Sequence, residues 1–131
     1  MNKPKTRILV IDDEEDLCFF LKANLEARGA YDVRTATSAL KGIRLARRFK
    51  PDLVILDILM PGANGFNVLR TIKEDNKTVH IPVLMVSALS DDRSKVEAAR
   101  LYCEDYMSKP VPVDDLRKRV EKILKLWKRP G

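Results

Sequence analysis

The chain has 131 residues, of which 45% are hydrophobic and 34% charged, a size and composition typical of one globular domain. It contains no apolar run near the roughly 20 residues of a membrane span, and its start lacks the apolar stretch of a signal peptide. We therefore expect a cytoplasmic protein with no membrane partner, whose formal net charge of +6 permits an acidic partner or nucleic acid.

Five short segments have the composition of β-strands. Ile8–Ile11, Leu53–Leu56 and Ile81–Val86 are continuously apolar and rich in Val, Ile and Leu, whereas Tyr31–Ala36 and Cys103–Met107 mix polar and apolar residues. Continuous apolar runs are typical of strands buried on both faces. The first three segments are therefore expected to be central strands, and the other two edge strands.

Segments with a helical period separate and follow these strands. The positions at helical spacing are Leu17, Phe20, Leu21 and Leu25; then Leu40, Ile43 and Arg47; then Phe66, Leu69 and Ile72; then Val96, Ala99 and Arg100; and finally an apolar stripe of Leu116, Val120, Ile123, Leu124 and Trp127. Ser38 is placed to cap the second helix, Ser90 or Asp91 the fourth, and Gly29 to end the first. The sequence thus alternates strand and helix five times.

This alternation predicts the fold class. Parallel strands need crossover connections, and here each crossover is a helix. We therefore expect an α/β fold: a doubly wound, five-stranded parallel sheet with five helices and the flavodoxin-like strand order 2-1-3-4-5. Such a fold places its functional residues at the carboxyl ends of its strands.

Polar residues follow four of the predicted strands. Asp12 to Asp16 are an unbroken acidic run after the first strand, Asp57 follows the third, Ser87 the fourth, and Lys109-Pro110 the fifth. Each has an ordinary structural explanation, such as a helix cap, a turn or a solvated loop. Taken together, however, Asp12, Asp13 and Asp57 would crowd at one rim of the sheet. Carboxylates at that range favour a hard divalent cation, and Mg²⁺ suits such a site.

These residues carry a resemblance to a known family. Asp12-Asp13, Asp57 heading Asp-Ile-Leu-Met-Pro-Gly, Ser87-Ala88 and Lys109-Pro110 after Tyr106 resemble the motifs of the receiver domain of two-component response regulators, over about residues 6 to 125. The resemblance implies that Asp57 accepts a phosphoryl group and that Asp12, Asp13, Asp57 and the backbone carbonyl of Leu59 hold Mg²⁺.

The resemblance also implies roles for the remaining residues. Lys109 would pair with the phosphoryl group, Ser87 would donate a hydrogen bond to it, and Tyr106 would turn with Ser87 as a switch. The Lys109–Pro110 peptide bond would be cis. This switch would change the partners of the face formed by the fourth helix, the fifth strand and the fifth helix. The domain would catalyse its own phosphorylation and dephosphorylation without turning over a separate substrate.

Some positions depart from the family pattern. Ser87 stands where the family often has Thr, Asn64 where it usually has Asp, and Tyr102-Cys103 where it commonly has Gly-Ala. Leu59 and Leu89, two residues beyond Asp57 and Ser87, would place a hydrolytic water poorly. This motivates the hypothesis of a long-lived aspartyl phosphate.

Three other function classes fit these residues less well. A haloacid-dehalogenase-like phosphatase would have Asp-x-Asp, but Leu59 stands at the second position. A flavodoxin-like flavin binder would need a hydroxyl- and glycine-rich loop where the acidic run stands. A receiver fold kept only for binding would have lost an acid or the lysine, and none is missing.

Nucleic-acid binding is the remaining alternative. Two predicted helices are basic, the second with Lys41, Arg44, Arg47 and Arg48, and the last with Arg117, Lys118, Arg119, Lys122 and Lys125. No DNA-reading motif accompanies them, so direct DNA binding is not expected. The expected partners are a sensor histidine kinase or phosphotransfer protein and a downstream output protein or fused output domain; a phosphorylation-dependent dimer stays open. We expect residues 1–125 to form the receiver domain and 126–131 a basic C-terminal tail or the start of a linker.

The cysteines and the histidine add little chemistry. Cys18 and Cys103 are far apart in no metal-like spacing, which predicts buried reduced thiols. His80 is the single histidine, so a metal site built from histidines is excluded.

Overall fold

The computed structural model describes residues 4–60, 63–88, 97, 101 and 103–127. Its main sheet has five parallel strands: β1 (Thr6–Ile11), β2 (Tyr31–Ala36), β3 (Leu53–Asp57), β6 (Val83–Ser87) and β7 (Asp105–Ser108). Their order across the sheet is β2-β1-β3-β6-β7. Counted in chain order within this sheet, that is the predicted 2-1-3-4-5.

The burial of each strand follows from its place in the sheet. Every residue of β3 and β6 is buried, and so are the last four residues of β1, whereas the edge strands β2 and β7 are only partly buried. Central strands are covered on both faces and therefore need apolar side chains throughout. The predicted division into central and edge strands is confirmed.

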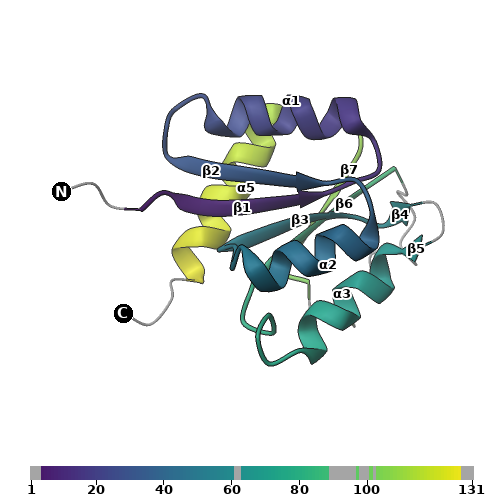
Figure 1. The fold of residues 1–131 in the computed structure, drawn as a ribbon. Coiled ribbons are helices and arrows are strands. Elements are labelled where there is room, and N and C mark those ends of the chain that lie inside the picture. Colours follow the sequence, from purple (N-terminus) through teal and green to yellow (C-terminus); the bar gives the residue numbers. More distant parts are fainter. Residues whose placement is uncertain (1–3, 61–62, 89–96, 98–100, 102, 128–131) are drawn as a thin grey trace.

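Helices cover both faces of the sheet (Figure 1). Buried residues of α1 (Glu15–Glu26) and α5 (Val113–Leu126) join one core cluster with one set of strand side chains. Those of α2 (Ala39–Arg48) and α3 (Gly65–Glu74) join a second cluster on the other face. The described residues thus contain four of the five predicted helices. The helix expected around Val96, Ala99 and Arg100, with its cap at Ser90 or Asp91, lies outside them.

The predicted signals at helix ends have the expected geometry. The hydroxyl of Ser38 accepts a hydrogen bond from the backbone N–H of Lys41 at 3.3 Å, capping α2. Gly29 follows α1 with a φ of 77°, a left-handed conformation that glycine adopts without steric cost. Both residues therefore define where a helix meets its connecting loop.

Two of the predicted apolar stripes are partly wrong. Phe20 and Leu40 are 47% and 61% exposed, because α1 buries Cys18, Leu21 and Leu25 and α2 buries Gly42 and Ala46. The face of α2 that meets the sheet carries small residues: a methyl group on Gly42 would come within 2.8 Å of the side chain of Ile11. The larger Leu40 is consequently turned to solvent.

The C-terminal end of α5 and the segment after β3 also differ from the sequence prediction. Trp127 follows α5 and is 44% exposed, so it does not complete the predicted core stripe. A two-stranded antiparallel hairpin, β4 (Leu59–Met60) and β5 (Ala63–Asn64), was not predicted and links β3 to α3. Residues 61–62 between them lie outside the described part.

The two cysteines lie in or against the hydrophobic core. Both cysteines are free thiols; Cys18 is buried as predicted, but Cys103 is only half buried. Burial raises the pKa of each thiol to about 11, so neither is a ready nucleophile.

Within the described residues, no helix has the length and apolar character that crossing a membrane would demand.

Candidate functional site

Three aspartates meet at the carboxyl edge of the sheet. Asp12 follows β1 and Asp57 ends β3, and pairing of these neighbouring strands brings the two side chains together. Oxygen atoms of Asp12, Asp13 and Asp57 all lie within 4.8 Å of one another. Asp12 and Asp57 are each only 3% exposed. The structure therefore brings together the acids that the sequence predicted to crowd at this rim.

Local backbone packing holds Asp57 in place. The N–H of Gly65, the first residue of α3, donates to the carbonyl of Ile58 at 2.7 Å. A methyl group on Gly65 would collide with the backbone of Asp57 and Ile58, so only glycine permits this close approach. The backbone N–H of Leu59 donates to Oδ1 of Asp57 at 3.2 Å. One carboxylate oxygen is thus oriented by the chain that follows β3.

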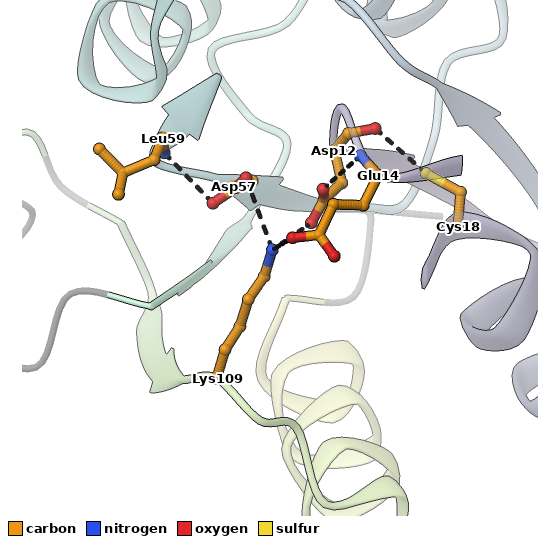
Figure 2. A network of polar contacts seen from close by, with 6 residues as sticks. All are labelled: Asp12, Glu14, Cys18, Asp57, Leu59 and Lys109. Atoms are coloured by element: carbon orange, nitrogen blue, oxygen red, sulfur yellow. Dashed lines mark hydrogen bonds and ion pairs between the residues drawn. The ribbon is translucent and has the colours of Figure 1, made fainter. Parts of the chain in front are cut away.

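Lys109 follows the edge strand β7, and its side chain points to this cluster, as Figure 2 shows. Its Nζ lies 3.0 Å from Oδ2 of Asp12, 3.0 Å from Oε1 of Glu14 and 3.6 Å from Oδ2 of Asp57. Its backbone N–H donates to the carbonyl of Ser87 at 2.7 Å, which ties the end of β7 to that of β6. A single ammonium group therefore faces several carboxylates.

The electrostatics reflect this imbalance of charge. The pKa of Asp57 is raised from 3.8 to about 6, mainly by burial and then by the negative charge of Asp12, against the attraction of Lys109. The pKa of Asp12 is also raised, again mainly by burial. Burial lowers the pKa of Lys109, but hydrogen bonds to Glu14 and Asp12 outweigh it and hold that pKa above its ordinary range. The cluster favours binding of an additional cation.

The donor set fits a hard divalent metal ion. It consists of carboxylate oxygens, the ligands that Mg²⁺ prefers, and their separations allow one ion to contact all three acids. Asp13 is only partly buried, which leaves this side of the cluster open to solvent. The residues present therefore suit a metal site that keeps some of its water.

The other predicted site residues lie around this rim. Ser87, fully buried, ends β6 beside Asp57 at the end of β3, because Asp57 pairs with the neighbouring Val86. Tyr106 lies in β7, pairs with Met85 and packs, partly buried, against the core cluster under α2 and α3. The Lys109–Pro110 peptide bond is cis, as the resemblance implies. Leu89 lies outside the described residues.

Sequence reasoning missed one member of the site. In the sequence Glu14 is only one member of an acidic run, yet its carboxylate binds Lys109 as closely as Asp12 does. Its backbone N–H also donates to Oδ1 of Asp12 at 2.9 Å. The signal was its position one residue after the aspartate pair, at the same rim, but nothing in the sequence gave the direction of its side chain.

Comparison with known proteins agrees with this geometry. A family model described as "Response regulator receiver domain" matches residues 8–121. The chain is 39% identical over 118 residues to the protein PilH of Pseudomonas aeruginosa, covering 90% of this chain and 97% of that protein.

Other relatives are longer than this chain. It is 38% identical to the DNA-binding dual master transcriptional regulator RpaA of Synechocystis, covering 91% of this chain and 49% of that protein. It is 37% identical to the alkaline phosphatase synthesis transcriptional regulatory protein PhoP of Bacillus subtilis, covering 95% of this chain and 50% of that protein. The chain thus spans about half the length of these two regulators.

Solved structures share the architecture. A CheY-like response regulator receiver domain protein from Methanospirillum hungatei superposes with a TM-score of 0.89 at 24% identity, covering 98% of this chain and all of that one. The signal receiver domain of a signal transduction histidine kinase from Syntrophus aciditrophicus superposes with a TM-score of 0.85 at 29% identity, covering 96% of this chain and 95% of that one. At 24% identity the first likeness shows the fold alone.

Proposed function

The chain belongs to the response regulator receiver domain family, and from that premise we propose that Asp57 accepts a phosphoryl group from a phosphohistidine of a sensor kinase or phosphotransfer protein. A receiver is a signalling module and not an enzyme that turns over a separate substrate. The observation that carries the proposal is the convergence of Asp12, Asp13, Asp57 and Lys109 at one rim of the sheet.

The reaction needs little covalent chemistry from the protein. An Oδ atom of Asp57 attacks phosphorus in line, forming a P–O bond while the P–N bond to the donor histidine breaks and its electron pair leaves with the imidazole. Oδ1 of Asp57 is held by the N–H of Leu59, which leaves Oδ2, 3.6 Å from Lys109, as the oxygen available for attack. Lys109 then offsets the charge of the phosphoryl oxygens.

Asp12, Asp13, Asp57 and the backbone carbonyl of Leu59 are the proposed ligands of Mg²⁺. The three carboxylates support this assignment through their mutual distances and burial; the role of the Leu59 carbonyl rests on the family resemblance. Bound there, Mg²⁺ supplies positive charge that offsets the negative charge of both the acids and the incoming phosphoryl group. Without such charge, the acids at this rim would repel an anionic donor.

The response to phosphorylation is proposed to run through Ser87 and Tyr106. The hydroxyl of Ser87 can donate to a phosphoryl oxygen, an interaction that exists only after transfer and therefore shifts the balance between two conformations. Tyr106 lies two strand positions before Ser108, the neighbour of Ser87 in the sheet. Its rotation would alter the surface formed by β7 and α5, which is the proposed binding surface for an output partner; the fourth helix predicted for this face lies outside the described residues.

The proposal also covers the domain bounds, the location and the output of the protein. We place the receiver domain at residues 1–125 and a basic tail or linker start at 126–131. The protein acts in the cytoplasm on a downstream output protein or a fused output domain, with a phosphorylation-dependent dimer as one form of output. Similarity to PilH over 97% of its length supports the first arrangement, and similarity to half of RpaA supports the second.

A phosphorylation assay tests the proposal. Incubated with Mg²⁺ and acetyl phosphate, the wild-type protein should gain one phosphoryl group by intact-mass spectrometry, and Asp57→Ala should gain none. Asp115→Ala, which removes an exposed aspartate at the start of α5, should be labelled like wild type. A wild-type sample that no acyl-phosphate or phosphohistidine donor labels, or labelling that persists in Asp57→Ala, would refute it.

A further inference from the structure

A basic hollow lies beside α2, well away from the acidic rim. Arg44, Arg47, Arg48 and Lys77 line this hollow, whose volume is about 420 Å³, and all four side chains are exposed. The first three project from the second half of α2, and Lys77 from the connection between α3 and β6. Because α2 runs back antiparallel to the strands, this end of the helix lies at the amino edge of the sheet, opposite Asp57 (Figure 1).

The positive charge of this hollow is mostly uncompensated. Within α2 there are four cationic residues and no acid. Arg47 pairs with Asp75 at 3.0 Å, whereas Arg44, Arg48 and Lys77 have no ion pair within the described part of the chain. By contrast, α1 and α5 carry both signs of charge. The hollow is therefore suited to an anionic partner.

A second hollow continues the positive surface. It shares Arg48 with the first and adds Arg7 and Arg34, together with one acid, Asp32. The guanidinium groups of Arg7 and Arg34 lie 5.4 and 4.8 Å from the centre of the Phe49 ring. These contacts hold the two arginines in place, which lowers the entropy lost when they bind a ligand.

Apolar side chains lie beside the cations. Leu40 is 61% exposed, and the helical period places it in one row with Arg44 and Arg47. Val79, two residues after Lys77, is 46% exposed. An exposed leucine next to arginines matches a ligand that carries both carboxylates and apolar side chains.

We propose that this surface docks an acidic, amphipathic segment of a partner protein. Its carboxylates pair with Arg44, Arg48 and Lys77, and its apolar side chains cover Leu40. A nucleic-acid duplex fits less well, because Asp75 and Asp32 would face its phosphates and because its phosphates would not cover the exposed apolar side chain of Leu40.

A model peptide tests the proposal. The probe is a fluorescein-labelled helical peptide of about 18 residues, with Glu at i, i+4 spacing and Leu beside it, and a matched peptide has Gln in place of Glu. Binding is followed by fluorescence anisotropy at low and high salt, and its location by ¹⁵N chemical-shift changes in the wild-type protein. The acidic peptide should bind, and its affinity should fall as the salt concentration rises. It should shift the amide resonances of α2 and of residues near Lys77.

Charge-reversed variants supply the control. Arg44→Glu with Arg48→Glu should weaken acidic-peptide binding roughly tenfold or more. Lys118→Glu with Lys122→Glu changes the net charge equally on the exposed face of α5 and should leave the affinity within about twofold. The ¹⁵N spectrum of each variant verifies its fold.

Several results would overturn the proposal. One is the absence of saturable binding at millimolar acidic peptide in low salt. Others are an equal loss of affinity in both double variants, or equal binding of the Gln peptide. Tighter binding of duplex DNA or inorganic triphosphate to the same amides would assign the surface to phosphate ligands instead.

Discussion

Lys73 and Lys109 each have a side chain that is only 14% exposed, and each forms an ion pair with a carboxylate. The net charge around the two lysines differs. Lys73 meets one acid, Glu104, at 2.8 Å and donates to the carbonyl of Ile81. The other oxygen of Glu104 accepts from the N–H of Val83 at 2.8 Å. Lys109 instead faces Asp12, Glu14 and Asp57.

The difference separates a structural ion pair from a functional site. The Lys73–Glu104 pair is neutral. Lys73 donates to the carbonyl of Ile81, and Glu104 accepts from the N–H of Val83, so the pair joins α3, the start of β6 and the residue before β7 at the amino edge of the sheet. The cluster around Lys109 carries excess negative charge, which destabilises the folded protein until a cation or a proton is bound. Substitutions in the two regions should therefore change stability in opposite directions.

The largest effect is expected at the balanced pair. Glu104→Leu leaves the ammonium group of Lys73 buried without a counterion, which should lower the free energy of unfolding by roughly 3–5 kcal/mol. Urea denaturation measures the change, and Glu74→Gln, at an exposed position of α3, is the control. A loss under about 1 kcal/mol would mean that the pair contributes no more than a surface ion pair does.

At the unbalanced cluster, removing an acid should stabilise the protein. Because the pKa of Asp57 is raised to about 6 from 3.8, the folded state binds this proton more tightly than the unfolded chain does. Stability from this group is complete below about pH 4 and is lost as the pH rises through 6. Without metal at pH 7, Asp57→Asn should therefore raise the free energy of unfolding by roughly 3 kcal/mol.

The pH dependence distinguishes this effect from better packing. The gain from Asp57→Asn should shrink as the pH falls from 7 towards 4, whereas a packing effect would persist. Asp115→Asn, at an exposed position, should change little at any pH. A destabilised Asp57→Asn protein at pH 7 would contradict the imbalance inferred for the cluster.

Metal should relieve the same imbalance. At about 100 times its dissociation constant, Mg²⁺ is expected to stabilise the wild-type protein by about 2.7 kcal/mol. Asp13→Asn removes one charged oxygen from the cluster, so calorimetry should show weaker Mg²⁺ binding. Glu104→Gln, in the other network, should bind Mg²⁺ like wild type. Equal affinities in wild type and Asp13→Asn would remove Asp13 from the ligand set.

The smallest effect is expected beside the cluster. Leu59 is 51% exposed and contacts Asp57 through its backbone, so Leu59→Asn changes the polarity of the rim and keeps the backbone hydrogen bond. If the apolar side chain places water poorly, this variant should lose phosphate several-fold faster, a barrier change of about 1 kcal/mol. Identical rates of phosphate release would reject the hypothesis of a long-lived aspartyl phosphate.

Much of the site was predictable, because the carboxyl ends of all strands in a parallel sheet lie at the same edge. Once Ile8–Ile11 and Leu53–Leu56 are read as adjacent buried strands, Asp12 and Asp57 must lie at the same edge. The helix stripes were less predictable, since small residues such as Gly42 can form a packed face that a hydrophobic pattern does not reveal. Leu40 was misplaced for that reason.

By itself, the sequence determined the α/β class, the central and edge strands and the convergence of three aspartates and a lysine, since these depend on residue type and on periodicity along the chain. Only the tertiary structure decided which acids share each lysine. The side chain of Glu14 turns to Lys109, and Glu104 reaches Lys73 across 31 positions of sequence. Such pairings depend on side-chain direction and on distances between separate elements, which no local pattern encodes.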